Sequence, residues 1–279
     1  MSLISVRNVW KEYDDTVVLE QINLEIDQRA FVALVGPSGC GKTTFLKMLL
    51  SEEQPTRGTI KIDDAPISPE PTADRGVVYQ RYSVFSHLTV LGNVLLGREL
   101  QAGGPAGMLF GRLFGAEKAL AVAEARELIA AVGLSHAESR YPAQLSGGMQ
   151  QRLALAQALM GRPKVLLLDE PFGALDPGIR AEIHVLMRNL WNERALTIVM
   201  VTHDLPEAFA LATRVIAFER RRNEPTDCGR YGATITQDFE IWPRRIPAPL
   251  DSLKPPGRDD PTPQTVSYRD DPVKTGSAA

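Results

Sequence analysis

The glycine-rich segment GPSGCGKTT, residues 36–44, could bind phosphate groups. It follows the apolar run Phe31–Val35 and precedes an apolar stretch with helical character, which is typical of the phosphate-binding loop G-x-x-x-x-G-K-[ST]. Its glycines let backbone N–H groups surround phosphate oxygens, and the helix N-terminus adds partial positive charge. Lys42 can reach the β- and γ-phosphates, and the Thr43 hydroxyl can bind Mg²⁺. The predicted nucleotide-binding residues here are Gly36, Pro37, Ser38, Gly39, Cys40, Gly41, Lys42, Thr43 and Thr44.

Two neighbouring carboxylates form the second chemical signal. The apolar run VLLL, residues 165–168, is followed directly by Asp169 and Glu170, and open α/β sheets bind ligands at the carboxyl ends of their strands. Asp169 is predicted to hold Mg²⁺, and Glu170 to orient or deprotonate the attacking water. Taken alone, an Asp-Glu pair is usually a solvated strand end, and the alternative for the glycine-rich segment is a turn without a ligand. Found together, they indicate a P-loop nucleoside triphosphatase.

A third motif, LSGGMQQR at residues 145–152, opens a helix between these two elements. Here the sequence resembles the ABC ATPase family, whose hallmark is LSGGQ, with Met149 in place of the usual glutamine. Ser146, Gly147 and Gly148 would form a second phosphate-binding helix N-terminus, and the alternative is a plain glycine turn. The resemblance implies that this motif faces ATP bound to the opposite protomer, so that the protein works as a head-to-tail homodimer.

Four further positions match the family in chain order. The resemblance implies that Tyr13 stacks on adenine, that Gln80 touches Mg²⁺ or the water, and that His203 contacts the γ-phosphate. Residues 174–176 match the D-loop, which communicates across the dimer. The alternatives are a half-buried strand tyrosine, a surface glutamine and a structural histidine. The predicted catalytic residues are Glu170, His203 and Gln80, and the predicted Mg²⁺ ligands are Thr43, Gln80 and Asp169. No other metal site is predicted.

Apolar patterns predict the elements that position these residues. Short alternating strands are expected over residues 3–31, buried strands at 31–35, 165–168 and 197–201, and helices at 117–132, 150–160 and 179–192. This is the pattern of an α/β protein. With the resemblance, it predicts a P-loop ABC-type nucleotide-binding domain with an N-terminal antiparallel β subdomain and an inserted α-helical subdomain at about 81–160. We also expect Asp204 to cap the following helix, with Glu207 completing a capping box.

The proline-rich C-terminal stretch differs from the rest of the chain. We expect the ATPase domain to span residues 3–220, a C-terminal extension to span 221–250, and the polar segment 251–279 to be disordered. The glycine-rich segment 101–115 is expected to form a surface loop. The apolar residues Val84, Phe85 and Leu88 are expected to line a groove for a helix of a membrane partner.

Composition limits the kinds of partner. A net charge of −3 over 279 residues provides no general attraction for nucleic acid, so none is predicted. The first residues do not resemble a signal peptide, and the apolar runs are shorter than the ~20 residues that span a bilayer. Two cysteines, Cys40 and Cys228, fit a reducing compartment. We therefore expect a peripheral protein on the cytoplasmic face of the inner (plasma) membrane.

The resemblance implies a transport ATPase that binds ATP and Mg²⁺ and acts with transmembrane permease subunits and a periplasmic or extracellular solute-binding protein. Residues 81–97 and 170–180 are similar to importer ATPases for nitrate, sulfonates and taurine. Residues 231–239 are similar to the tails of ATPases associated with urea- or guanidine-like substrates. One alternative is a soluble ABC ATPase of DNA repair or translation, although the sequence lacks coiled-coil insertions, cysteine-rich modules and a second ATPase domain. The other alternative is an inactive scaffold, which Glu170 and His203 argue against.

Overall fold

The computed structural model describes residues 2–80, 83–102, 115–220 and 230–241, all within one compact unit, Met1–Trp242. Its strands are β1 (Ser2–Tyr13), β2 (Thr16–Asp27), β3 (Phe31–Val35), β4 (Arg57–Ile62), β5 (Ala65–Pro66), β6 (Arg75–Val78), β7 (Val165–Asp169), β8 (Thr197–Val201), β9 (Arg214–Arg220) and β10 (Ala233–Glu240). Its helices are α1 (Lys42–Leu50), α2 (Val90–Ala102), α4 (Gly115–Ala131), α5 (Gly147–Met160), α6 (Pro177–Arg194) and α7 (Leu205–Leu211), with short 3₁₀ turns η1 (Ser135–Ala137) and η2 (Pro142–Gln144).

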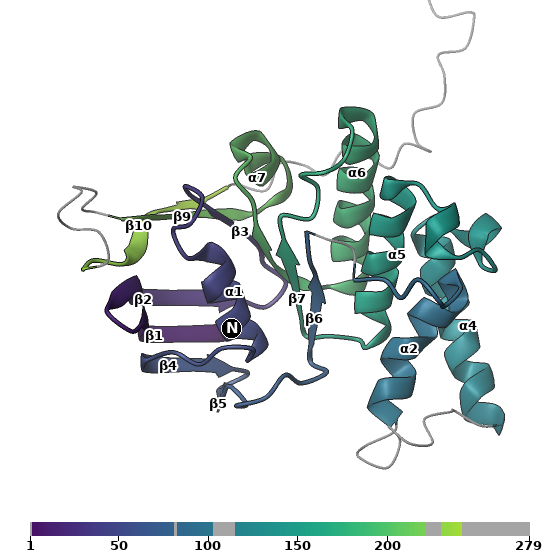
Figure 1. Ribbon diagram of the computed structural model, residues 1–279, viewed down its shortest axis with the longest axis horizontal. Coiled ribbons are helices and arrows are strands. Elements are labelled where there is room, and N and C mark those ends of the chain that lie inside the picture. The colour runs from purple at the N-terminus through teal and green to yellow at the C-terminus, as the bar shows by residue number, and fades with distance from the viewer. Residues whose placement is uncertain (1, 81–82, 103–114, 221–229, 242–279) are drawn as a thin grey trace, which may run out of the picture. The chain divides into compact units, whose positions relative to one another are not determined.

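The described strands form one mixed sheet in the order β5-β4-β1-β2-β10-β9-β3-β8-β7-β6. Strands β9, β3, β8, β7 and β6 are parallel, and every residue of β3 and β8 is buried, as expected for parallel strands covered on both faces. Strands β5, β4, β1 and β2 are antiparallel. Figure 1 shows β1, β2 and β4 side by side, with the parallel strands next to them. The predicted α/β fold and N-terminal antiparallel subdomain are therefore confirmed.

The helices α2, α4 and α5 pack against one another and form one cluster of helices (Figure 1). The predicted helices are confirmed, although α5 begins at Gly147 rather than at residue 150, because Ser146 caps it. Alanine and leucine side chains of α4 and α5, including Ala125, Leu128 and Leu155, are buried in one common core. Within the described ranges, no helix is both long and apolar enough to cross a membrane.

The sheet continues beyond residue 220, into the expected C-terminal extension. Strand β10 pairs along β9 from Ala233–Arg220 to Glu240–Arg214, and Ala233 also pairs with Leu19 of β2. The guanidinium of Arg214 forms two hydrogen bonds, of 2.7 and 2.6 Å, with the carboxylate of Asp238. The outer half of β10 is exposed and, apart from Phe239, polar, which is why its sequence resembles a surface extension. The expected tail, 251–279, and most of the expected loop at 101–115 lie outside the described residues.

Candidate nucleotide-binding site

The phosphate-binding loop, residues 36–44, connects β3 to α1 and requires glycine at two positions. Gly36 has φ of 147°, and an added Cβ would lie 2.1 Å from the carbonyl oxygen of Phe218. Gly41 has φ of 96°, and an added Cβ would lie 2.7 Å from Leu19 Cδ2. The loop thus turns tightly into α1, whose first-turn N–H groups have no partners within the helix. These groups form the concave, positively polarised surface that phosphate binding needs.

Lys42 places its ammonium group inside this loop. The Nζ atom donates hydrogen bonds to the carbonyl oxygens of Gly36 (2.7 Å) and Pro37 (2.8 Å), and the residue is only 5% exposed. The buried thiol of Cys40 lies 3.6 Å from the same Nζ atom. Cys40 therefore fills space beneath the loop, as its small size suggests, and the ammonium is held beside the first-turn amides of α1.

Thr43 and Asp169, two of the predicted Mg²⁺ ligands, are brought together by the fold. The Thr43 hydroxyl lies on α1 and donates a hydrogen bond of 3.1 Å to Asp169 Oδ1 at the end of β7. Burial raises the pKa of Asp169 above its ordinary range; the Thr43 hydrogen bond opposes this rise, and the neighbouring charge of Glu170 adds to it. A hydroxyl beside a partly desolvated carboxylate is a donor set that suits Mg²⁺, which prefers oxygen ligands. The residues present thus fit the predicted ion.

Glu170 and His203 meet across the ends of β7 and β8. His203 Nδ1 lies 3.3 Å from Glu170 Oε2. The Glu170 backbone adopts φ of 44°, and its N–H donates to the carbonyl oxygen of Val201 (2.9 Å), which turns the chain sharply after β7. This turn directs the carboxylate toward the histidine. A carboxylate and an imidazole at one strand edge can orient a water molecule and accept its proton.

Gln80 lies at the same edge, although its side chain is exposed. Strands β6 and β7 pair Val78 with Leu168. Gln80 comes two residues after Val78, and Glu170 comes two residues after Leu168, so both follow the ends of these adjacent strands. Among the described contacts, none joins the Gln80 side chain to Asp169 or Glu170. The sheet register therefore supports the predicted position, and the role of Gln80 as an Mg²⁺ ligand stays a prediction.

Tyr13, at the end of β1, lies beside the end of the phosphate-binding loop. Its hydroxyl is hydrogen-bonded to the carboxylate of Glu53 and to Thr44, and Lys11 Nζ lies 4.6 Å from the ring centroid. Burial raises the pKa of Tyr13 to about 12, and the Glu53 carboxylate contributes to the rise. Lys11 covers one face of the ring, and the stacking of Tyr13 on adenine stays a prediction. No motif contains Glu53 or Lys11, so the sequence offered no signal for either.

Ser146, Gly147 and Gly148 contact a different part of the protein. The Ser146 hydroxyl caps α5 by accepting the N–H of Met149 (3.3 Å). Gly148 packs so closely against α6 that an added Cβ would lie 2.5 Å from Ile179 Cγ2. Met149 packs against the main core, which accounts for an apolar residue at this position. Among the described contacts, none joins these residues to the phosphate-binding loop, so a single chain does not bring the two glycine motifs together.

The contacts of the residues that follow His203 were only partly predicted. Asp204 caps α7, as expected, because its Oδ1 accepts the N–H of Glu207 (3.0 Å). The predicted capping box is wrong, since the Glu207 carboxylate turns inward and binds the Thr202 hydroxyl (2.6 Å) and His184 Nε2 (3.1 Å). Burial of this carboxylate, which is 5% exposed, requires such partners. A local sequence pattern carries no information about partners on another helix.

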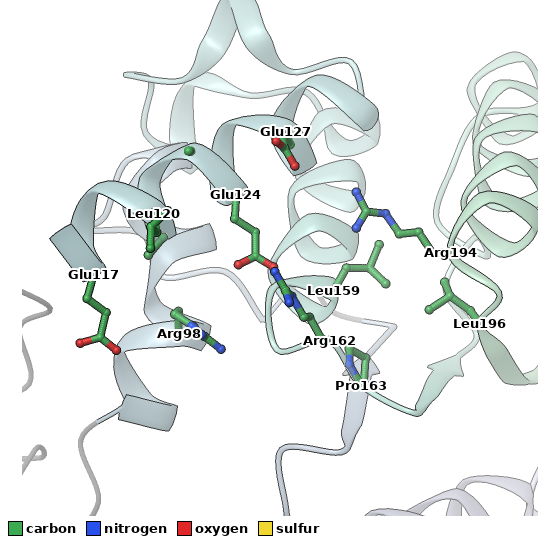
Figure 2. A pocket seen from close by; sticks show the side chains of 12 residues that line it. Arg98, Glu117, Leu120, Glu124, Glu127, Leu159, Arg162, Pro163, Arg194 and Leu196 are labelled. Atoms are coloured by element: carbon green, nitrogen blue, oxygen red, sulfur yellow. The ribbon is translucent and has the colours of Figure 1, made fainter.

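A separate pocket of about 690 Å³ lies between α4 and the C-terminal ends of α5 and α6. Figure 2 shows Glu124 and Arg162 side by side in its wall, where they form an ion pair of 2.6 Å. Pro163, which precedes β7, also lines it. This pocket is therefore at the amino end of β7, whereas Asp169 is at the carboxyl end, and it plays no part in the candidate nucleotide site.

Comparisons with known proteins agree with this geometry. The family model for the ABC transporter matches residues 19–173. The sulfate/thiosulfate import ATP-binding protein CysA of Mesorhizobium japonicum is 42% identical over 226 residues, which cover 79% of this chain and 62% of the relative. The protein of the same name from Pseudomonas aeruginosa is 43% identical over 219 residues, covering 78% and 64%. The chain thus spans less than two thirds of these relatives, and their names do not include the nitrate, sulfonate or taurine branch expected from the sequence.

Solved structures show the same fold. The dimeric structure of MJ0796, a bacterial ABC transporter cassette, superposes with a TM-score of 0.67 at 28% identity, covering 86% of this chain and all of that chain. The ADP conformation of MJ1267, an ATP-binding cassette of an ABC transporter, gives a TM-score of 0.72 at 20% identity, covering 86% and 91%, which supports the fold alone. Together with the family match over more than half of the sequence, the arrangement of phosphate-binding loop, carboxylates and LSGG motif places this chain in the ABC transporter family.

Proposed function

We propose that this chain is the ATP-binding and ATP-hydrolysing subunit of an ABC transporter. Assays of the isolated chain and of the assembled transporter can test this proposal. One observation carries the proposal: strand ends and the phosphate-binding loop meet at one edge of the sheet. Thr43 bonds Asp169 there, and Glu170 faces His203. This edge provides groups for binding phosphates, holding a cation and activating water within a single chain.

Each residue has a distinct part in the proposed reaction. The loop amides and Lys42 bind the phosphates, and Thr43 and Asp169 would hold Mg²⁺, which would neutralise charge on the phosphate oxygens. Glu170 orients the attacking water and accepts its proton, while His203 contacts the γ-phosphate and is oriented by Glu170. Because Mg²⁺ favours the ionised form of a carboxylate, its binding also offsets the cost of ionising the partly desolvated Asp169.

A homodimer completes the proposed site. Ser146 and Gly147 are exposed at the N-terminus of α5 and are not in contact with the phosphate-binding loop of their own chain. A second copy in head-to-tail orientation would supply them to the ATP held at Lys42. The dimeric form of MJ0796 supports this arrangement. The binding of ATP between two chains then links hydrolysis to their opening and closing.

To test hydrolysis, we would measure phosphate release by the purified chain, alone and assembled with membrane subunits, with ATP and Mg²⁺. We expect release that EDTA abolishes. His203→Ala should lower the rate by roughly 10²-fold, the lower end of the effect of a positioned catalytic group. The matched control is His136→Ala, because His136 is exposed on η1. If neither the chain nor the assembly hydrolysed ATP, the proposed function would be wrong.

A membrane partner is proposed to bind beside α2. Two pockets, of about 430 and 410 Å³, share Phe85 and Leu96, and the second is also lined by Leu88 and Leu95. The Phe85 ring is 41% exposed. Apolar pockets of this kind accept the apolar face of a helix, and the helix of a permease subunit is the proposed occupant. The chain would then lie at the cytoplasmic face of the inner membrane, with a solute-binding protein on the other side.

Replacing Phe85 tests this surface. Phe85→Asp should reduce transport and co-purification with the permease, because a charge cannot be buried unpaired in an apolar contact. ATP binding by the isolated chain should be unchanged. Phe239→Asp is the matched control, since Phe239 is similarly exposed (45%) but lies on β10. Unchanged transport and assembly in Phe85→Asp would place the permease contact elsewhere.

The proposed transport direction is import of a small solute. The relatives in the comparisons are named as sulfate/thiosulfate importers, and the segments 81–97 and 170–180 resemble importer ATPases for nitrate, sulfonates and taurine. Sulfate, thiosulfate, nitrate and sulfonates are all small oxyanions, so an oxyanion is the proposed solute class, and a urea- or guanidine-like compound is the alternative. Uptake of labelled sulfate, nitrate, taurine and guanidine by cells with and without this chain distinguishes the two classes.

A further inference from the structure

Arg180, in the first turn of α6, joins two segments of the site that are separate in the sequence. Its Nη2 donates to the carbonyl oxygen of Leu175 (3.3 Å), in the D-loop that precedes α6. Its Nη1 donates to Asp204 Oδ2 (3.1 Å), on the residue directly after His203. One rigid guanidinium therefore connects the D-loop to the segment that carries the candidate γ-phosphate contact.

The residue before His203 is held firmly by the sheet. Thr202 is 2% exposed, and its N–H donates to the carbonyl oxygen of Leu34 in β3 (3.1 Å). Its hydroxyl donates to the buried carboxylate of Glu207 (2.6 Å) and accepts the N–H of Asp204 (3.1 Å). None of these contacts is made with residues 174–176. The N-terminal side of His203 is thus fixed by the core.

The residue after His203 is held differently. The Asp204 side chain is 31% exposed; one carboxylate oxygen caps α7 and the other accepts Arg180. Both hydrogen bonds are charge-assisted, because both are accepted by the carboxylate, and the bond from Arg180 is the one that orients it toward α6. Any displacement of the Leu175 carbonyl changes the position of Arg180 and therefore the pull on Asp204. His203 thus lies between a neighbour held by the sheet and one bonded to Arg180.

We propose that Arg180 is a positioning residue that transmits the position of the D-loop to His203 through Asp204. The expected effect of Arg180 on the reaction rate rests on the proposed ATP hydrolysis. Its expected effect on His203 can be measured without nucleotide. Arg180 touches neither Lys42 nor Thr43, so its loss should affect the rate of hydrolysis and not the binding of ATP.

The kinetic test compares three variants of the full chain. Arg180→Gln removes the charge and should lower kcat for ATP by about tenfold, because a hydrogen bond to a charged group contributes roughly that factor, with KM unchanged. Arg180→Lys keeps the charge and should recover part of the rate. Arg194→Gln is the matched control, since Arg194 is exposed in the last turn of the same helix. Asp204→Asn keeps the helix cap. Combining it with Arg180→Gln should lower kcat no further than Arg180→Gln alone does.

The structural test uses NMR signals of the histidine rings in the nucleotide-free chain, which has four histidines. Arg180→Gln should shift the His203 signal, assigned with His203→Gln, and leave those of His87 and His136 in place, with Tm close to wild type. An unmoved His203 signal, or a kinetic loss accompanied by a fall in Tm and by shifts of all four signals, would overturn the proposal. If the wild-type chain failed to hydrolyse ATP, the proposed function would fail, and the NMR result would still decide the role of Arg180.

Discussion

The helices α1 and α5 both begin after a short segment rich in glycine, and the surroundings of their N-termini differ. At α1, Lys42 is buried in the loop and Thr43 bonds Asp169 from the neighbouring strand. At α5, Ser146 binds an N–H of its own helix and is exposed, and Gly148 packs on α6. The first N-terminus thus has charged partners for phosphate and Mg²⁺ within the chain. The second offers backbone N–H groups and one hydroxyl, and no described contact joins it to the phosphate-binding loop of its own chain.

The largest expected effect comes from Glu170→Gln. The amide keeps the size of the side chain but cannot accept a proton from water, so hydrolysis should fall by roughly 10²–10⁴-fold. ATP should still bind at Lys42 and Thr43, and it should then hold two chains together between Lys42 of one and Ser146 of the other. Size-exclusion chromatography with ATP and Mg²⁺, on the assembled transporter if the isolated chain stays monomeric, measures this accumulation.

Lys42→Ala is the matching variant for the first N-terminus. It removes a phosphate contact and should abolish both ATP binding and ATP-dependent dimerisation, whereas Glu170→Gln keeps both. The contrast between the two N-termini would be lost if Lys42→Ala dimerised with ATP as Glu170→Gln does. Hydrolysis at the wild-type rate in Glu170→Gln would remove this residue from the mechanism.

A smaller effect is expected from Gly148→Ala at the second N-terminus. The added Cβ would lie 2.5 Å from Ile179 Cγ2, and such overpacking costs about 1–3 kcal/mol. Relief of the overlap displaces the start of α5, so ATP-dependent dimerisation should weaken by about tenfold while a single chain binds ATP as before. Gly148→Ala combined with Ile179→Ala restores space and should recover dimerisation. Equal weakening of ATP binding by the monomer would show that the two N-termini are not independent.

The smallest expected effect concerns the pH dependence of stability at the first N-terminus. Because the pKa of Asp169 is raised in the folded chain, its contribution to stability is present below the ordinary carboxyl pKa and is lost as the pH rises through the raised value. Asp169→Asn should therefore raise Tm at neutral pH without nucleotide, by only about 2 °C, since water screens the half-buried group.

The Tm values of Asp169→Asn and of the wild type are compared in a series of thermal melts from acidic to neutral pH. The gain over wild type should disappear at acidic pH, where Asp169 is protonated in both folded and unfolded chains. Adding ATP and Mg²⁺ should stabilise the wild type more than Asp169→Asn. A gain in Tm that did not depend on pH would mean that burial of the charge is not its cause.

Local patterns in the sequence predicted much of the fold and the candidate site. The buried strands β3, β7 and β8 were predicted because parallel strands covered on both faces are apolar throughout. The phosphate-binding loop was predicted because its glycines, Lys42 and Thr43 have fixed spacing, and its conformation depends on residues close in the chain. The cap at Asp204 was predicted for the same reason, since a cap acts within one turn.

Strand β10 and the inward turn of Glu207 were decided by the tertiary structure. The edge of β9 determines whether residues 233–240 add to the sheet, and that edge is formed by a different segment. Likewise, Glu207 binds Thr202 and His184 because α6 and β8 enclose it. Both features arise where a polar sequence packs against a distant element, and hydrophobic periodicity cannot report such packing.

By itself, the sequence determined the kind of chemistry: a phosphate-binding loop, two carboxylates at a strand end, and a second glycine motif before a helix. These features depend on residue types at short spacing in the chain, and they do not depend on how distant segments pack. Only the tertiary structure decided which of these groups meet, with Asp169 against Thr43, Glu170 against His203, and Arg180 between the D-loop and Asp204. The physical reason is that each of these contacts joins different helices or strands, and the packing of the sheet and its helices, rather than any local pattern, sets the distances between them.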